Sequence, residues 1–203
     1  MSHVVKVKVK IRNLDALRSA ASKLGLEMTE KSTYRWYGTH VGDYPLPEGF
    51  SKEDLGKCQF AISVPGKPNA YEIGVVKDPA SPGEYTLLWD FWSRGYGLQD
   101  VVGDDARKLT DAYTLEAARI TATEQGWYSE YTSVDGVEHL VIYHPSGGTL
   151  TVSPRGTVDA DGFIGAGCAE ATGLLGGSLG ITVDESIKAA FYSQQQHLNL
   201  NQE

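Results

Sequence analysis

Apolar and polar residues alternate in several segments of the chain, and each such segment predicts a β-strand. Between residues 5 and 11 every second position is valine or isoleucine, with lysines at the positions between, which predicts a strand with one buried and one basic face. Residues 84–92 are dense in aromatic side chains and predict the strand at the centre of the fold. Further strands are predicted at residues 33–37, 58–64 and 70–76, the last two joined as a hairpin by a turn rich in proline and glycine.

Helical spacing of apolar residues predicts two helices in the first part of the chain. Asn13 is placed to cap the first helix and Gly25 to end it. The second, longer helix is predicted to begin at the acidic pair Asp104 and Asp105, because negative charge suits the positive end of the helix dipole. Gly126 is placed to end it, and its apolar stripe consists of Leu109, Tyr113, Ala117 and Ile120.

Turn signals organise the remainder of the chain. Val134-Asp-Gly136 predicts a tight hairpin between strands at residues 127–132 and 139–143. Residues 145–148 read Pro-Ser-Gly-Gly, a composition typical of a linker. We therefore predict a boundary there, with an N-terminal domain over residues 1–144 and a small C-terminal domain over residues 148–203.

The C-terminal part predicts a hairpin and a helix. Strands are expected at residues 149–152 and 157–161, followed by a short helix whose stripe is Cys168, Thr172, Leu175 and Leu179. Together these elements predict an α+β fold, in which a mostly antiparallel sheet has helices packed on one face and is followed by a small β-hairpin-plus-helix unit. The opposite sheet face would carry Lys6, Lys8 and Lys10.

Composition narrows the classes of function. The 203 residues carry a net charge of −8, which disfavours non-specific binding to nucleic acid or to anionic membranes. No apolar run approaches the roughly 20 residues that span a bilayer, and the lysine-rich N-terminus is not typical of a signal peptide, so we expect a cytoplasmic protein. The only cysteines, Cys58 and Cys168, predict neither a disulfide framework nor a zinc site. No cofactor is predicted.

Three features suggest chemistry, and each also has a structural explanation. Gly176-Gly-Ser-Leu-Gly180 matches the G-x-S-x-G pattern, but a nucleophile elbow needs a strand before Ser178 and here a helix is predicted. Cys168 is placed near a helix N-terminus, where a thiol becomes reactive, yet it also belongs to the core-facing stripe. Gly165 and Gly167 form a turn that offers backbone N–H groups to an anion, although tight packing explains these glycines equally well. None of the five histidines has the spacing of a metal-binding pair.

Aromatic residues form the strongest candidate for a binding surface. They occur at Tyr34, Trp36, Tyr37, Trp89, Trp92 and Tyr96. Such residues serve both as core filling and as interface anchors, and the sequence leaves both readings open. As candidate partner-binding residues we take Tyr34, Trp36, Asp90, Trp92 and Arg94. As candidate anion-binding residues we take the basic stripe Lys6, Lys8 and Lys10, which Arg12 extends.

Several of these segments resemble a known family. Met1-Ser-His, with Lys-Val-Lys-Ile-Arg-Asn-Leu-Asp-Ala-Leu ending at Leu17, resembles the opening of the conserved hypothetical chloroplast reading frame thirty-five family, a domain of unknown function in plastids, cyanobacteria, other bacteria and phages. Trp89-Asp-Phe-Trp92, the helix around Leu109 and Gln125-Gly126 resemble its second half, so the resemblance covers roughly residues 1–143. Leu150-Thr-Val-Ser-Pro-Arg-Gly-Thr-Val158 and the glycines and Cys168 that follow resemble a second small domain of unknown function, encoded beside MoxR-like AAA+ ATPases.

The resemblance implies an accessory partner of an AAA+ ATPase and supplies no catalytic residues. We therefore expect a non-enzymatic adaptor that binds a protein partner, with a cellular or a phage origin equally open. The alternative is a protein that binds a small anion such as a nucleotide, through the basic stripe and the Gly165–Gly167 turn. An enzyme that uses Cys168 or Ser178 is a third hypothesis, and the oligomeric state stays open.

Overall fold

The computed structural model describes residues 3–7, 9–163 and 167–179. The fold is α+β, as predicted, with a five-stranded and a four-stranded antiparallel sheet. The chain divides into two compact units, Met1–Tyr113 and Thr114–Glu203, and each is considered by itself below.

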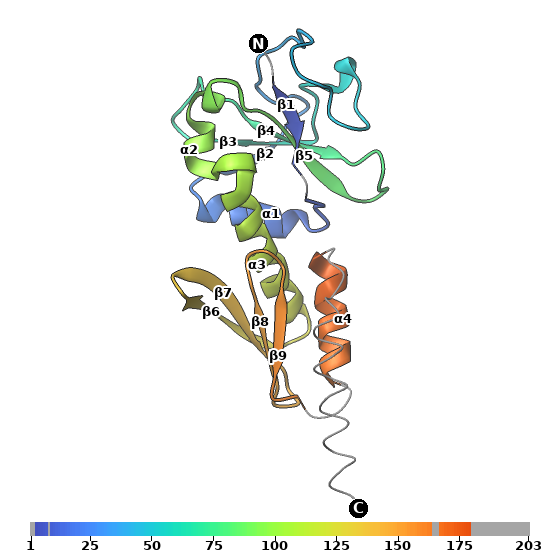
Figure 1. Cartoon of the computed structure of the whole chain (residues 1–203), viewed down its shortest axis with the longest axis vertical. Coiled ribbons are helices and arrows are strands. Elements are labelled where there is room, and N and C mark those ends of the chain that lie inside the picture. The colour runs from blue at the N-terminus through green and yellow to red at the C-terminus, as the bar shows by residue number, and fades with distance from the viewer. Residues whose placement is uncertain (1–2, 8, 164–166, 180–203) are drawn as a thin grey trace, which may run out of the picture. The chain divides into compact units, whose positions relative to one another are not determined.

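The first unit is built on the five-stranded sheet. Its strands are β1 (Val4–Lys6), β2 (Glu27–Glu30), β3 (Phe60–Ser63), β4 (Ile73–Lys77) and β5 (Tyr85–Asp90). Its helical segments are α1 (Leu14–Lys23), η1 (Lys52–Asp54), η2 (Trp92–Gly97), α2 (Leu98–Val102), η3 (Asp104–Ala106) and the first part of α3 (Arg107–Glu124). The strand order is β1-β5-β4-β3-β2. Figure 1 shows α1 on one side of this sheet and the long loop of residues 31–59 on the other.

Local signals at α1 and in the β3–β4 hairpin are confirmed. The Asn13 side chain accepts a hydrogen bond from the Ala16 N–H at 2.9 Å, which caps the first turn of α1. Gly25 follows α1 with φ +71°, and the Leu26 N–H donates back to the Ala21 carbonyl. β3 and β4 pair as an antiparallel hairpin.

The alternation predicted for residues 5–11 is interrupted. Lys6 pairs with Leu88 of β5 and Ile11 pairs with Tyr85, so this segment advances five residues while β5 advances three. The bulge shifts the buried positions to Val4, Val7 and Ile11. A strictly alternating buried face is therefore wrong for this segment.

Two further local predictions are wrong. Residues 33–37 are not a strand, because β2 ends at Glu30 and Thr33 makes only an isolated bridge with Lys57. Asp104 and Asp105 do not cap the long helix directly. They lie in η3, where Asp105 has φ +52° and Ala106 has φ +56°, and α3 begins at Arg107.

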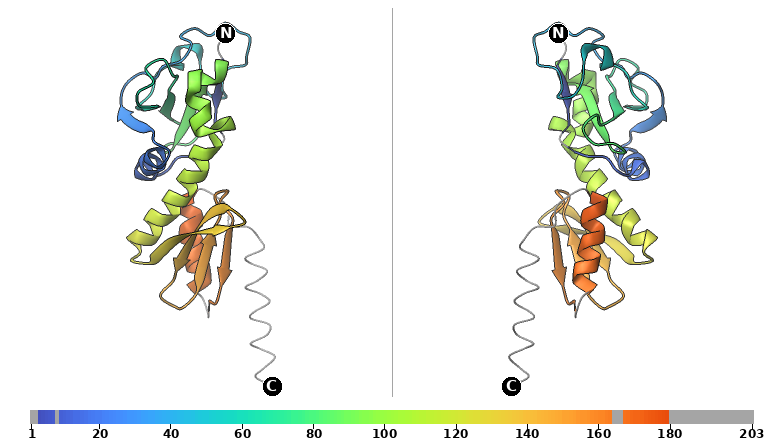
Figure 2. Two further views of the ribbon diagram at one scale, coloured as in Figure 1. Left: turned by 90° about the vertical axis from the view of Figure 1, so that its left-hand side faces the viewer. Right: turned by 90° about the vertical axis from the view of Figure 1, so that its right-hand side faces the viewer.

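The second unit contains the rest of α3, the four-stranded sheet and α4 (Gly167–Leu179), which lies alongside this sheet in both views of Figure 2. The strands are β6 (Tyr128–Val134), β7 (Val137–Tyr143), β8 (Thr149–Val152) and β9 (Val158–Asp161), in the order β6-β7-β8-β9. The predicted tight turn is confirmed. Val134 pairs with Val137, and Asp135 and Gly136 have φ +52° and +77°, as a two-residue hairpin turn requires.

The core of the second unit lies against one face of its sheet. Buried strand residues on that face are Leu140, Ile142, Leu150, Val152 and Val158. From α4, Thr172, Leu175 and Leu179 are buried, as their predicted stripe requires. Residues 145–148, where a domain boundary was predicted, connect β7 to β8, which are neighbours in one sheet. The two compact units divide between Tyr113 and Thr114.

Candidate functional site

Asp90, at the end of β5, joins three separate segments of the first unit. Its side chain is fully buried. Oδ1 accepts hydrogen bonds from the backbone N–H groups of His3 and Trp92, each at 3.0 Å, and Oδ2 accepts one from Tyr37 N–H at 3.2 Å. A buried carboxylate is stabilised when its lone pairs meet donors in this way. Asp90 therefore fixes the chain start, the long loop and the turn after β5 to one another.

Glu72 fixes the same loop a few residues earlier. It is also buried. Lys31 Nζ lies 2.8 Å from both carboxylate oxygens, and the Arg35 N–H donates to Oε2 at 2.7 Å. In return, the Glu72 N–H donates to the Arg35 carbonyl at 2.9 Å. Two buried carboxylates thus hold residues 31–37 against the sheet, although this segment forms no strand.

The segments joined by Asp90 carry exposed apolar side chains. We call Tyr37, Val41, Tyr44 and Tyr96 the aromatic surface; their exposed fractions are 45%, 51%, 37% and 51%. The Tyr44 ring lies 5.4 Å from the His3 ring, and the Tyr96 ring packs edge-on to Tyr71 at 5.0 Å. Tyr44 and Tyr96 are therefore each supported by another ring while part of the side chain faces solvent, and Tyr37 is held through its backbone N–H by Asp90.

The turn after β5 has an unusual backbone. Ser93, Arg94, Gly95 and Tyr96 have φ values of 50°, 56°, 59° and 51°, with ψ between 27° and 42°. This is one turn of left-handed helix, which costs roughly 1–2 kcal/mol for each residue other than glycine. The Gly95 carbonyl accepts from Tyr71 N–H at 2.9 Å, and the Arg94 guanidinium binds Asp100 at 2.8 Å. Backbone strain of this kind is often found at functional sites, which motivates a role for this turn.

Tyr34 and Trp36, two of the predicted binding residues, lie in or against the core. Tyr34 is buried and its ring covers Gly74 of β4 so closely that a Cβ there would overlap it. Trp36 is half-buried and covers Gly56 in the same way. Burial raises the pKa of the Tyr34 phenol well above its usual value. Both side chains pack with Val4, Leu88 and neighbouring core residues under the long loop.

Trp92 and Arg94, two further predicted binding residues, differ in their surroundings. Trp92 is half-buried, and its ring meets the His3 ring edge-on at 5.3 Å. Arg94 is open to solvent, with 65% of its side chain exposed. The structure thus brings Asp90, Trp92 and Arg94 together at one turn, with Tyr34 and Trp36 beneath the neighbouring loop.

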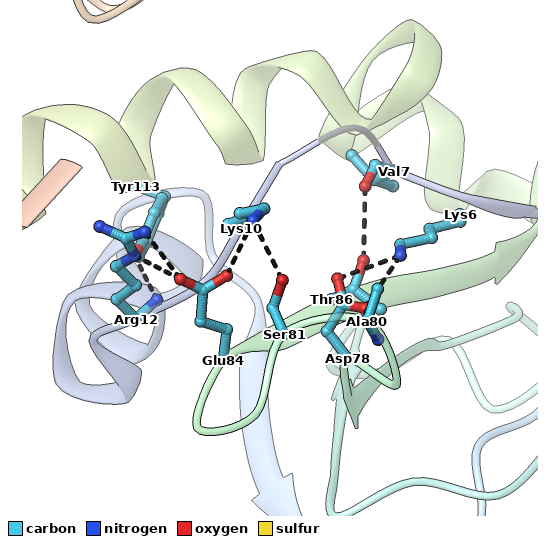
Figure 3. A network of polar contacts seen from close by, with 10 residues as sticks. All are labelled: Lys6, Val7, Lys10, Arg12, Asp78, Ala80, Ser81, Glu84, Thr86 and Tyr113. Atoms are coloured by element: carbon cyan, nitrogen blue, oxygen red, sulfur yellow. Dashed lines mark hydrogen bonds and ion pairs between the residues drawn. The ribbon is translucent and has the colours of Figure 1, made fainter. Parts of the chain in front are cut away.

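The described cations of the predicted basic stripe are engaged with carboxylates, as Figure 3 shows. Lys6 Nζ lies 3.0 Å from Asp78, and Lys10 Nζ lies 3.3 Å from Glu84. The Arg12 guanidinium lies 2.7 Å from the other oxygen of Glu84. These pairs neutralise the charge of Lys6, Lys10 and Arg12, which weakens their attraction for an external anion.

The two carboxylates of this network respond to their partners. Burial by itself would raise the pKa of Asp78, but hydrogen bonds from Ala80 N–H and Lys6 lower it below its usual value. Burial likewise opposes ionisation of Glu84, and hydrogen bonds from Arg12 and Lys10 lower its pKa. The network connects the β1 segment to the turn between β4 and β5. Holding these two segments together is a sufficient explanation for the network, and no bound anion is needed to account for it.

The remaining predicted residues are Lys8 of the basic stripe and four residues in or just before α4. Lys8 and Gly165 lie outside the described residues, and Gly167 is the first residue of α4. Ser178 lies within α4, so the strand–turn–helix context of a nucleophile elbow is not present at that position. Cys168 lies in the first turn of α4. Cys58 is buried, and burial raises the pKa of its thiol to about 11.

Sequence reasoning missed His3, Tyr44, Tyr71 and Glu72 as parts of this region. His3 is 87 residues from Asp90 along the chain, and Tyr37 is 53 residues away. No local pattern reports such a contact, because only the pairing of β1 and β4 with β5 brings these residues together. The one local signal was the glutamate at position 72, a charged residue within the mostly apolar segment 70–76 that was predicted as a strand.

Among the described residues, no group of three or more His, Cys, Asp or Glu side chains is arranged to hold a metal ion. Within the same residues, no helix combines the length and apolarity needed to cross a membrane. The chain matches no protein-family model, no curated protein and no solved structure.

Proposed function

We propose that the protein is a non-enzymatic, cytoplasmic accessory protein whose first unit binds a protein partner through the aromatic surface. The observation that carries this proposal is the exposure of Tyr37, Tyr44 and Tyr96 on segments fixed by buried Asp90. Tyrosine supplies a large contact area with few rotatable bonds, so a supported tyrosine loses little entropy when it binds. Arg94, beside Tyr96, adds an exposed cation to the same turn.

Rigid support favours recognition of another protein. The left-handed turn and the Asp90 hydrogen bonds hold the tyrosines in place before a partner arrives, which reduces the ordering cost of association. The two buried carboxylates that hold the segments carrying this surface, Asp90 and Glu72, are already engaged by backbone N–H groups and cations. Their arrangement therefore supports a structural use and not proton transfer. As the partner we propose an AAA+ ATPase, on the basis of the family resemblance of residues 1–143.

The test is affinity capture from the native host, with tagged wild-type protein and a double variant, Tyr37→Ser with Tyr96→Asn. Asparagine tolerates the left-handed backbone at position 96, so the turn is retained while the ring is removed. The matched control, Leu174→Ser, removes an exposed apolar side chain from α4 of the second unit. All three proteins are first shown to unfold at similar temperatures.

We expect mass spectrometry to find an AAA+ ATPase with the wild type and the control, and at least tenfold less of it with the double variant. The loss of two interface anchors, at about 1–2 kcal/mol of binding free energy each, lowers the affinity by more than about tenfold. Equal recovery with all three proteins would rule out the aromatic surface. Capture of only proteins of other classes would rule out the proposed partner.

A further inference from the structure

The second unit has a sheet face that is exposed, opposite its core. Side chains alternate between the two faces of a strand, and the register places Tyr128 opposite Tyr143, with Thr149 and Asp161 next across the sheet. These residues lie on the face opposite buried Leu140 and Ile142. Tyr128 is 64% exposed and Tyr143 39%. At the hairpin end of the same face, Val134 and Val137 are 44% and 48% exposed. We call this surface the outer face.

β6 forms one edge of this sheet. It is seven residues long and pairs only with β7 in the described sheet. Edge strands are commonly protected from pairing with other chains by lysine, by proline or by shortness. The β6 sequence, Tyr-Ser-Glu-Tyr-Thr-Ser-Val, has none of these protections. It is therefore suited to accept an additional strand.

Charge is distributed unequally between the two units. Residues 1–113 contain 15 Lys or Arg and 15 Asp or Glu, whereas residues 114–203 contain 3 and 11, so the whole net charge of −8 belongs to the second unit. The four strands of its sheet contain Glu130, Glu138, Asp159 and Asp161 and neither lysine nor arginine. The charge asymmetry points to a basic partner.

Glu130, Asp159 and Asp161 lie on the outer face. Glu130 is two residues from Tyr128 on β6, and Asp159 is two residues from Asp161 on β9, so each pair points to the same side of the sheet. Glu130 accepts hydrogen bonds from the Tyr143 hydroxyl at 2.6 Å and the Tyr128 hydroxyl at 3.3 Å, which fix its position beside the β6 edge. Asp159 and Asp161 lie on β9, and among the described residues neither has a cation within ion-pair distance. The outer face thus combines fixed negative charge with exposed aromatic rings.

We propose that the β6 edge and the outer face bind an extended lysine- or arginine-rich segment of a protein partner, which adds to the sheet as a fifth strand. Backbone hydrogen bonds to β6 supply the pairing, while Glu130 and the β9 aspartates select basic side chains. A second copy of this chain is disfavoured as the occupant, because two units of charge −8 repel each other. This surface is independent of the aromatic surface of the first unit.

The test uses the full chain and a labelled nine-residue peptide in which lysine alternates with threonine or valine. A peptide with glutamate in place of each lysine is the ligand control. Binding is measured by fluorescence anisotropy at about 50 mM salt, where screening is weak. The binding variant is Glu130→Gln with Asp159→Asn. The matched control, Glu124→Gln with Glu170→Gln, makes the same change in net charge at exposed helical positions outside the sheet.

We expect the lysine peptide to bind and the glutamate peptide not to bind. The sheet variant should weaken binding about three- to thirtyfold, from two ion pairs at a surface, while the control variant changes it less than twofold. Hydrogen exchange should show slower exchange in β6 when the peptide is bound. Equal weakening by both variants, or binding without protection of β6, would overturn the proposed site. Absence of binding, or self-association through β6 in the peptide-free protein, would overturn the proposed occupant.

Discussion

Replacement of Asp90 by asparagine tests how the first unit is assembled. The variant keeps the size of the side chain but turns one carboxylate oxygen into an NH₂ group. In the wild type, the three backbone N–H groups of His3, Trp92 and Tyr37 donate to this carboxylate at 3.0, 3.0 and 3.2 Å. If the amide oxygen faces His3 and Trp92, the NH₂ group faces the Tyr37 N–H, and two donors oppose each other.

The magnitude follows from these contacts. Each hydrogen bond to a charged group contributes about 1.5–3 kcal/mol, and an unsatisfied buried donor costs about 1–3 kcal/mol. The lower cost of burying a neutral side chain offsets part of this loss. We therefore expect Asp90→Asn to lower the free energy of unfolding by about 2–4 kcal/mol.

Urea unfolding followed by tryptophan fluorescence measures this loss, because Trp36, Trp89 and Trp92 all lie in the first unit. The matched control is Asp100→Asn. The Asp100 carboxylate is 57% exposed and binds Arg94 at the surface, so its loss should cost less than about 1 kcal/mol. If the two variants lose similar stability, the reasoning that Asp90 joins the three segments is refuted.

Three further predictions follow from the same unit. Ser93→Gly should raise the free energy of unfolding by about 0.5–1 kcal/mol, because relief of left-handed strain exceeds the entropic cost of glycine, whereas Ser63→Gly in β3 should lower it by a similar amount in the same urea assay. Gly74→Ala should lower thermal stability by about 1–3 kcal/mol through overlap with the Tyr34 ring, while Tyr34→Phe, which keeps the ring and removes only the buried hydroxyl, should cost no more than about 1.5 kcal/mol, the contribution of a single hydrogen bond. Burial raises the pKa of Tyr71 to about 12, so between about pH 10 and pH 12 only the unfolded chain loses this proton, and the free energy of unfolding should fall by up to about 1.4 kcal/mol per pH unit. Urea unfolding at several pH values should show that Tyr71→Phe removes this part of the pH dependence. An unchanged pH dependence in Tyr71→Phe would contradict the raised pKa of Tyr71.

Features set by neighbouring residues could be predicted from the sequence. The Asn13 cap, Gly25 after α1 and the Val134-Asp-Gly136 turn all depend on a few consecutive residues, and the structure confirms each one. The bulge between Lys6 and Ile11 could not be predicted, because valine and lysine fit a regular strand equally well. The shift appears only in the pairing with β5.

The candidate site was predicted in part, for the same reason. Asp90, Trp92 and Arg94 are close in sequence and the structure brings them to one turn. The left-handed conformation of Ser93 and Arg94 had no sequence signal, since neither is glycine. The contacts of Asp90 with His3 and Tyr37, and the covering of Gly74 by Tyr34, join residues that are distant in the chain.

Site-specific photo-crosslinking in the native host tests the proposed function most directly. A benzophenone amino acid is placed at position 37 or 96 of the aromatic surface, or at exposed position 174 in α4 of the second unit as a control. We predict that positions 37 and 96 crosslink to an AAA+ ATPase and that position 174 does not. No crosslinked protein at positions 37 and 96, or the same products from all three positions, would contradict the central claim that this surface binds the partner.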